Sequence, residues 1–376
     1  MFDFSYIQKE LDYYQKFIPL NYESEKDAFF QKQKKGIPYN PVFEYQDPLT
    51  VKNYHEIRVF LVNSKGADRI INHFLDRYVL VTDLMIAWKE DNYPGMTQLS
   101  GTLFGSYCQL DLPKAVERYK RVVSLDHSTQ ENLYCDEEIG CFFLKYFSQM
   151  GLSGWSIEYP ITSGSEVSIY ELEKKVVIRK GTVAGQAGLE RIICHEIVGH
   201  AFQAFNAMET GHPYTDWLTT YLGTETQYEG WAVFTEVNNL KQHHIIPIIR
   251  RYLFFMIATA MASELSFDKV YSRLFELSSD QEFSFFAAAK AKRGFSDTSV
   301  HGCFQKENSY LTGALMVIDL VRKNLENLNK LSLGVFPFTA LNDIQAQDEP
   351  AWASVKQVNH ANIEFFINTL NGCIDV

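Results

Sequence analysis

The sequence predicts a mostly helical α+β protein with one small sheet. Apolar residues recur every three or four positions from the start to about residue 150, which indicates helices. Between residues 154 and 180 the period changes to two, and after residue 188 the helical period returns and continues to the end. No internal repeat is visible, so a solenoid is disfavoured.

The N-terminal region, residues 1–150, is expected to be a set of helices packed on a catalytic region of residues 151–376. Two of its segments, SYIQKELDYYQKF and RIINHFLDRYVLVTDLMIAWKE, place apolar residues on one helical face. Proline-containing breaks separate the helices, but no low-complexity linker marks a domain boundary. The two regions are therefore expected to form one integrated domain.

The predicted sheet consists of three short antiparallel strands within GWSIEYPI, EVSIYEL and KKVVIRK. The last segment has four basic residues in seven positions. As an edge strand it could pair with an extended peptide, and its basic side chains, Arg179 and Lys180 among them, would suit an acidic substrate tail. Lysines also protect exposed strand edges from aggregation, so the pattern fits either use.

The composition disfavours several classes of function. The 376 residues carry a net charge of −11, which disfavours binding to nucleic acid or to anionic membranes. No membrane-spanning segment is expected, because the best apolar run, ALMVIDLV, is far shorter than roughly 20 residues. The opening residues do not resemble a secretion signal, and the six cysteines show no CxxC spacing. Reduced thiols and a cytoplasmic location follow as expectations.

The segment HEIVGH contains His195, Glu196 and His200 and resembles the zinc-peptidase signature HExxH with one additional residue. In a regular α-helix, residues four apart lie about 40° apart around the axis, whereas residues five apart lie about 140° apart and cannot bind one ion. A π-type turn returns both histidines to one face, and Gly199 tolerates unusual backbone angles. We therefore predict a π-bulge or broken turn at Gly199.

A catalytic zinc ion needs a third protein ligand beside two histidines. The segment TQYEGWAVFTE offers Glu229 and Glu236, seven residues apart on one helical face, so that one can bind metal while the other supports a histidine. Glu196 would accept a proton from the attacking water and deliver it to the leaving amine. The alternative is that HEIVGH is a chance string on a buried helix, with both histidines paired to core carboxylates.

Three segments together resemble the family of microtubule-associated tyrosine carboxypeptidases and related bacterial proteins named for a QEGLA motif. HEIVGH is similar to the family's HExxxH, YEGWAVFTE to its EGLA segment, and KRGFSDTSVHGCFQKENSYLTGAL to its RG, DTS, GCF, KD and YL..G pattern. Weaker similarity extends upstream, so that the resemblance covers most of the chain. The departures are Trp231 in place of Leu, Glu307 and Asn308 where KD is expected, and Val198 and Gly199 in place of Gly-Thr.

The resemblance implies a zincin-like metallopeptidase in which His195, His200 and Glu229 bind Zn²⁺ and Glu196 is the general base. It implies a carboxypeptidase that releases tyrosine from a protein tail such as that of α-tubulin, with microtubules as partner. A peptidase of an intracellular bacterium, acting in the host cytosol, would have the same features. The alternatives are a zinc peptidase with another peptide substrate and a catalytically silent relative that binds a protein. Histidine and carboxylate ligands favour zinc but also accept cobalt or manganese.

Two residues of the last segment are candidates for substrate binding. Arg293 could take a terminal carboxylate with both arms of its guanidinium. Tyr310 could donate a hydrogen bond to the oxyanion that forms during peptide hydrolysis. The alternatives are a surface arginine that pairs with a helix end and a buried tyrosine that donates to a backbone carbonyl.

Overall fold

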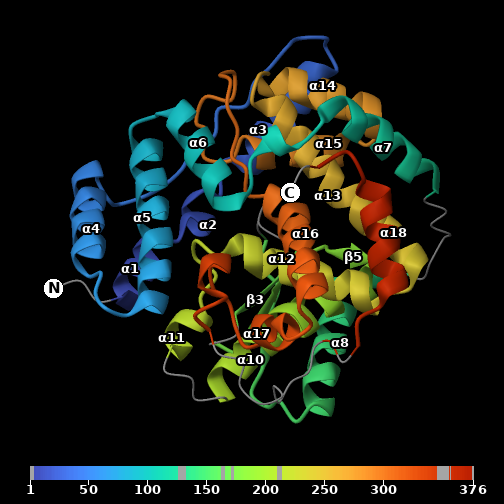
Figure 1. The fold of residues 1–376 in the computed structure, drawn as a ribbon. Coiled ribbons are helices and arrows are strands. Elements are labelled where there is room, and N and C mark those ends of the chain that lie inside the picture. The colour runs from blue at the N-terminus through green and yellow to red at the C-terminus, as the bar shows by residue number, and fades with distance from the viewer. Residues whose placement is uncertain are drawn as a thin grey trace.

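The computed structural model describes residues 4–125, 133–161, 166–170, 173–209, 214–344, 355 and 357–374. Most of these residues are helical, and their short strands form two small sheets. Figure 1 shows helices making up the bulk of the molecule, with the strands confined to one part of it. The predicted class, α+β and mostly α, is confirmed.

The N-terminal region is helical, as predicted, and two of its helices lie side by side at one edge of the molecule, α4 and α5 (Figure 1). Side chains fix where these two helices begin: Thr50 accepts a hydrogen bond from the backbone of Asn53, and Asp68 accepts one from Ile71. The helices of this region are α1 (Phe4–Glu10), α2 (Tyr13–Lys16), α3 (Tyr22–Gln33), α4 (Val51–Asn63), α5 (Arg69–Lys89), α6 (Tyr93–Phe104), η1 (Tyr107–Gln109), α7 (Leu112–Leu125) and α8 (Asp136–Gln149).

The larger sheet has the strand order β2 (Ser156–Glu158), β4 (Lys175–Ile178), β3 (Val167–Tyr170). Strand β4 pairs antiparallel with β3 but parallel with β2, so the prediction of a wholly antiparallel sheet is wrong. A two-stranded antiparallel sheet joins β1 (Tyr134–Cys135) to β5 (Val183–Ala184).

The basic segment KKVVIRK forms β4, which is the central strand of the larger sheet, so its predicted edge position is also wrong. The reason is its apolar face: Val176 and Ile178 are fully buried in one cluster with Ile197. A central strand covers such residues on both sides better than an edge strand does. Among the described strands, β3 is an outer strand of this sheet and pairs with β4 alone.

The C-terminal region is built around one central helix, α12, which packs against η2 and against α16 (Figure 1). Its helices are α9 (Gln186–Ile193), η2 (Cys194–Ala201), α10 (Phe202–Glu209), α11 (Thr215–Leu218), α12 (Glu225–Asn239), α13 (Gln242–Ala262), α14 (Phe267–Ser278), α15 (Gln281–Ala291), α16 (Asn308–Lys323), α17 (Asn327–Ser332), η3 (Phe338–Ala340) and α18 (His360–Leu370).

The largest core cluster joins side chains from both halves of the chain. Phe29 and Phe74 from N-terminal helices are buried in one cluster with Trp231 of α12 and Phe254 of α13. Burial of such large apolar side chains is the main stabilising contribution to a fold. The elements that surround α12 are therefore held in place from both sides of the molecule.

Helix α13 is the one described helix that is long and apolar enough to cross a membrane, judged by length and composition. The expectation that no segment has these properties is therefore wrong. Within the most apolar window of this helix, 78% of the residues are buried inside the protein. The composition fits a central core helix, since α13 packs against α7, α15 and α16.

Glycine residues, which have no side chain, allow α12 to approach η2 and α16 closely. A Cβ atom at Gly230 would lie 2.5 Å from Cα of Gly313 in α16. A Cβ atom at Gly199 of η2 would lie 2.9 Å from Cα of Ala232. Because Gly230 and Ala232 are two residues apart, they face nearly opposite sides of α12. Gly199 thus serves close packing, and its φ angle is not among the positive ones.

We predict that Gly313→Ala destabilises the protein by about 3 kcal/mol, because the new methyl group would meet the backbone of Gly230 and Thr226, which cannot rotate away. Gly66→Ala is the matched control, since a Cβ there meets nothing within 4 Å. Urea unfolding measures both. Equal stabilities of the two variants would contradict the close packing of α12 on α16.

Candidate metal centre and its cleft

The π-helix η2 places His195 and His200 on one face, as the spacing predicts. Residues Cys194–Ala201 form π-helical turns within an otherwise α-helical run from α9 to α10. The two imidazole rings lie 4.7 Å apart between centroids and are perpendicular to each other. The predicted π-type turn is therefore confirmed, and it brings both side chains to the same place.

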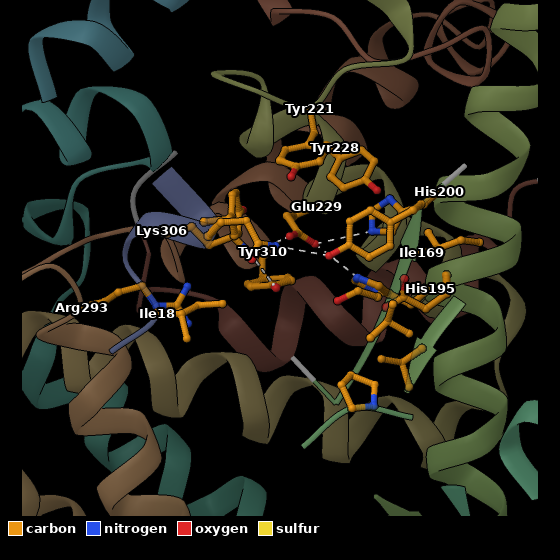
Figure 2. Close-up of a pocket in the computed structure, with 18 residues that line it drawn as sticks. Ile18, Ile169, His195, His200, Tyr221, Tyr228, Glu229, Arg293, Lys306 and Tyr310 are labelled. Atoms are coloured by element: carbon orange, nitrogen blue, oxygen red, sulfur yellow. Dashed lines mark hydrogen bonds and ion pairs between the residues drawn. The ribbon is translucent and has the colours of Figure 1, made fainter. Parts of the chain in front are cut away.

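Glu229 of α12 completes a cluster with the two histidines. Its Oε2 lies 3.3 Å from Nε2 of His195 and 3.7 Å from Nε2 of His200. All three residues are buried, and each offers one ligand atom within 4.8 Å of the others. Figure 2 shows Glu229 between the histidines and Lys306.

The geometry of these three residues fits a tetrahedral metal ion. Ligand atoms about 2.0–2.1 Å from a tetrahedral centre lie about 3.3 Å from one another, close to both distances found here. Oε2 of Glu229 is buried and has no hydrogen-bond partner among the described residues. A buried carboxylate oxygen facing two imidazole nitrogens is a donor set that zinc prefers.

Lys306 holds the other oxygen of Glu229. Its Nζ donates to Oε1 of Glu229 over 2.6 Å and to the hydroxyl oxygen of Tyr310 over 2.8 Å. Burial lowers the pKa of Lys306, but Glu229 more than offsets this and raises it above its ordinary value, so the side chain stays charged. Oε2 is thereby left facing the histidines.

Glu236 supports His195 from about two turns further along α12. Its Oε1 lies 2.8 Å from Nδ1 of His195, so Nε2 of the ring is directed at Glu229. Arg191 lies beside the same carboxylate, with Nη1 at 3.7 Å from Oε1. The predicted supporting contact of a carboxylate with a histidine therefore falls on Glu236.

The two histidines differ in their protonation. Burial lowers the pKa of His200 to about 4, so its ring is neutral at neutral pH. Burial also acts to lower the pKa of His195, but the neighbouring carboxylates of Glu229 and Glu236 outweigh it and raise the pKa to about 10. In the metal-free protein, His195 is therefore an imidazolium held between two carboxylates.

The cluster opens into a cleft of about 310 Å³ that Glu196 also lines. The side chain of Tyr228 stacks on His200, with ring centroids 3.6 Å apart, and Tyr221 stacks on Tyr228. Tyr310 also lines the cleft, near His195 (Figure 2). The arrangement combines a buried ligand cluster, a carboxylate beside it and an aromatic cleft, which together suit hydrolysis of a bound peptide.

Comparison with known proteins identifies the family of this chain. Residues 28–355 match the microtubule-associated tyrosine carboxypeptidase family. The chain belongs to this family. The match covers most of the 376 residues, as the resemblance of the three motif segments implies.

The chain is similar to mammalian proteins named microtubule-associated tyrosine carboxypeptidase 1. It is 24% identical to the rat protein over 305 residues and 24% identical to the human protein over 304 residues. Each alignment covers 80% of this chain and 55% of the relative. The chain therefore spans about half the length of these carboxypeptidases.

The structure separates the four predicted substrate-binding residues of this family member. Tyr310 lines the cleft next to the cluster, and Arg293 lines it on the side away from the histidines (Figure 2). Lys180 is exposed and lies 3.3 Å from both Asp136 and Glu137, so it has no place in the cleft. Arg179 follows β4 and is likewise absent from the lining.

Sequence reasoning assigned no role to Lys306 or Tyr228. The signal for Lys306 was its position four residues before Tyr310, one helical turn away on the same face. Tyr228 immediately precedes Glu229, but its contact with His200 depends on how α12 crosses η2. Only the packed structure shows that these side chains meet at the cluster.

We predict that Lys306→Met lowers the free energy of unfolding of the metal-free protein by about 3 kcal/mol, because it removes the cation that contacts Oε1 of Glu229 and leaves that oxygen buried and unpaired. Glu229→Gln in the same chain should recover part of this loss. Chemical denaturation of the two single variants and the double variant gives the coupling energy. Strictly additive losses would contradict the buried ion pair.

Proposed function

We propose that the protein is a zinc-dependent carboxypeptidase of zincin-like fold that removes a C-terminal residue, preferentially tyrosine, from a protein tail such as that of α-tubulin. The observation that supports it most is the buried cluster of His195, His200 and Glu229, with Glu196 beside it in an open cleft. Family membership supports the carboxypeptidase class. We also propose that it acts in the cytoplasm.

The residues present fit zinc in number, atom type and spacing. Bound at the cluster, zinc would supply a Lewis acid that polarises the scissile carbonyl and lowers the pKa of water. His195, His200 and Glu229 would hold the ion, while Glu236 and Lys306 fix the orientation of His195 and Glu229.

Glu196 and Tyr310 supply the remaining chemistry. Glu196 follows His195 directly and lines the cleft, so it can take a proton from the attacking water and pass it to the leaving amine. Burial holds the pKa of Tyr310 well above its ordinary value, so the phenol keeps its proton. Because Lys306 donates to its oxygen, the phenol hydrogen is directed elsewhere and can stabilise an oxyanion.

The free edge of β3 offers a binding surface for an extended peptide. All four residues of Val167–Tyr170 line the cleft. The backbone N–H of Arg179 donates to the carbonyl of Glu166 over 2.9 Å, so Glu166, Ser168 and Tyr170 face β4 in the ladder. The alternation then leaves the backbone groups of Val167 and Ile169 at the edge, available to a substrate strand.

We predict that Glu196→Gln abolishes release of tyrosine from an acidic peptide that ends in the α-tubulin tail sequence. The amide cannot accept the proton of the attacking water, and such groups contribute about 10²–10⁴ to the rate. Mass spectrometry of the peptide after incubation with each protein measures the loss, and metal analysis checks that the variant keeps its zinc.

The control for this experiment is Lys180→Gln, which changes an exposed residue outside the cleft and should release tyrosine at the wild-type rate. Fragments cut within the peptide would indicate an endopeptidase. No cleavage by a zinc-loaded wild-type protein would instead favour another substrate or a silent, protein-binding relative.

We predict that zinc binding at pH 7 releases about one proton per ion. His200, with a pKa of about 4, is already neutral, whereas His195, with a pKa of about 10, must lose its proton to bind. The apparent affinity should therefore rise about tenfold per pH unit between about pH 4 and pH 10, where His195 alone of the two histidines must lose a proton. Calorimetry in buffers of different ionisation enthalpy counts the protons, and a count of zero would contradict the imidazolium at His195.

A further inference from the structure

A second, smaller compartment adjoins the cleft beside Glu196. Its volume is about 60 Å³, and it shares His195, Glu196 and Tyr310 with the larger cleft. Since one water molecule needs roughly 10–15 Å³ of such accessible volume, this space admits a group of about the size of a carboxylate.

Three cations line the compartment, Arg191, Arg251 and Lys290, and each of them lies next to a carboxylate. Arg191 is shared between Glu166 and Glu236, at 3.8 and 3.7 Å. Lys290 is buried and donates to Glu307 over 3.0 Å. Both of these cations are therefore engaged by carboxylates within the fold.

Arg251 of α13, the third cation, has guanidinium N–H donors that its contact with Glu166 does not use. Its ion pair among the described residues joins Nη2 to Oε2 of Glu166 at 3.4 Å, and its guanidinium lies over the ring of Phe255. A guanidinium has five N–H donors, so one long contact leaves a second edge for another carboxylate. Its side chain is 27% exposed, more than that of Arg191 or Lys290.

Glu166 would keep a cation if Arg251 turned to a ligand. Arg251 and, after it, Arg191 lower the pKa of Glu166 to about 2, and Arg191 also contacts its Oε2. Arg191 would therefore remain beside the carboxylate of Glu166, the residue that precedes β3. The contact with Glu166 therefore holds the guanidinium of Arg251 next to the start of β3.

The direction of β3 decides which end of a bound peptide reaches this compartment. Glu166 and Val167, at the start of the strand, line it, whereas Tyr170, at the end, lies near Gln15 of α2. Antiparallel pairs are more common than parallel ones and slightly more stable per residue. A peptide paired antiparallel to β3 runs from the Tyr170 end towards Glu166, so its C-terminus arrives beside Arg251.

We propose that Arg251 binds the terminal carboxylate of the substrate, in the compartment beside Glu196, with the peptide antiparallel to β3. This inference rests on the proposed carboxypeptidase function and assigns the carboxylate to Arg251 in place of Arg293. Arg293 lines the larger cleft together with Ile18, away from the histidines (Figure 2). It would meet the carboxylate only if the peptide ran the other way.

The test compares binding of two labelled peptides, an acidic tail ending in tyrosine with a free carboxylate and the same peptide with a C-terminal amide. Zinc-loaded Glu196→Gln protein binds them without turnover, and fluorescence anisotropy gives each dissociation constant. We expect the acid to bind about ten- to a hundredfold more tightly than the amide. Adding Arg251→Gln should remove this preference while leaving the affinity for the amide unchanged.

The matched control is Arg273→Gln, an exposed arginine of α14, which should keep the full preference for the acid. If Arg251→Gln does not fold, Arg251→Lys replaces it, with a preference reduced about threefold or more because the fork geometry is lost. Unchanged preference in these variants, equal weakening of both peptides, or loss of the preference in Arg293→Gln instead would each overturn the assignment.

The wild-type protein separates this inference from the function on which it depends. If it releases the terminal tyrosine while the Arg251 variants keep their preference for the acid, the carboxypeptidase function stands and the assignment of Arg251 fails. If it cuts only within the peptide, or treats acid and amide alike, the carboxypeptidase proposal fails and the assignment fails with it.

Discussion

The arrangement of the candidate site depends on how closely α12 approaches η2 and α16. The backbone of α12 touches α16 where Gly230 meets Gly313, and it touches η2 where Ala232 meets Gly199. The two contacts lie on nearly opposite faces of α12. A side chain at any of these glycines would separate the helices by more than the tolerance of a hydrogen bond or a metal ligand. Glu229 can therefore reach the histidines of η2 and Lys306, which immediately precedes α16, at the same time.

Close packing places charged groups where water cannot solvate them, and the site compensates with a connected series of opposite charges. Lys306 contacts Glu229, Glu229 contacts His195, and His195 contacts Glu236, beside which Arg191 lies. Each charge is stabilised by the next, since an unpaired ion in such surroundings is strongly unfavourable. The same network orients the ligand atoms, so stability and function draw on the same contacts. Arg251 lies at the margin of this network, where exposure leaves room for a ligand.

Local patterns in the sequence were sufficient for the helical class, the π-type turn between His195 and His200, and Glu229 and Glu236 as partners for them. These features depend on spacing along one or two helices, which a sequence displays directly. The sheet was predicted with the wrong pairing, because alternation in KKVVIRK shows which residues are buried but not which strands lie on either side. Lys180 was predicted to bind substrate because the same segment was placed at the edge of the sheet. In the fold it pairs with Asp136 at the surface. No motif in the sequence pointed to Arg251 as a binding residue, since its position depends on where α13 passes β3.

X-ray absorption at the zinc edge, on the full chain loaded with one equivalent of zinc, tests the central claim most directly. The account predicts nitrogen and oxygen ligands at about 2.0–2.2 Å with two histidines among them, and loss of that signal in His200→Ala. Sulfur ligation at about 2.3 Å, which would implicate a cysteine such as Cys194, or the same spectrum in His200→Ala, would contradict it.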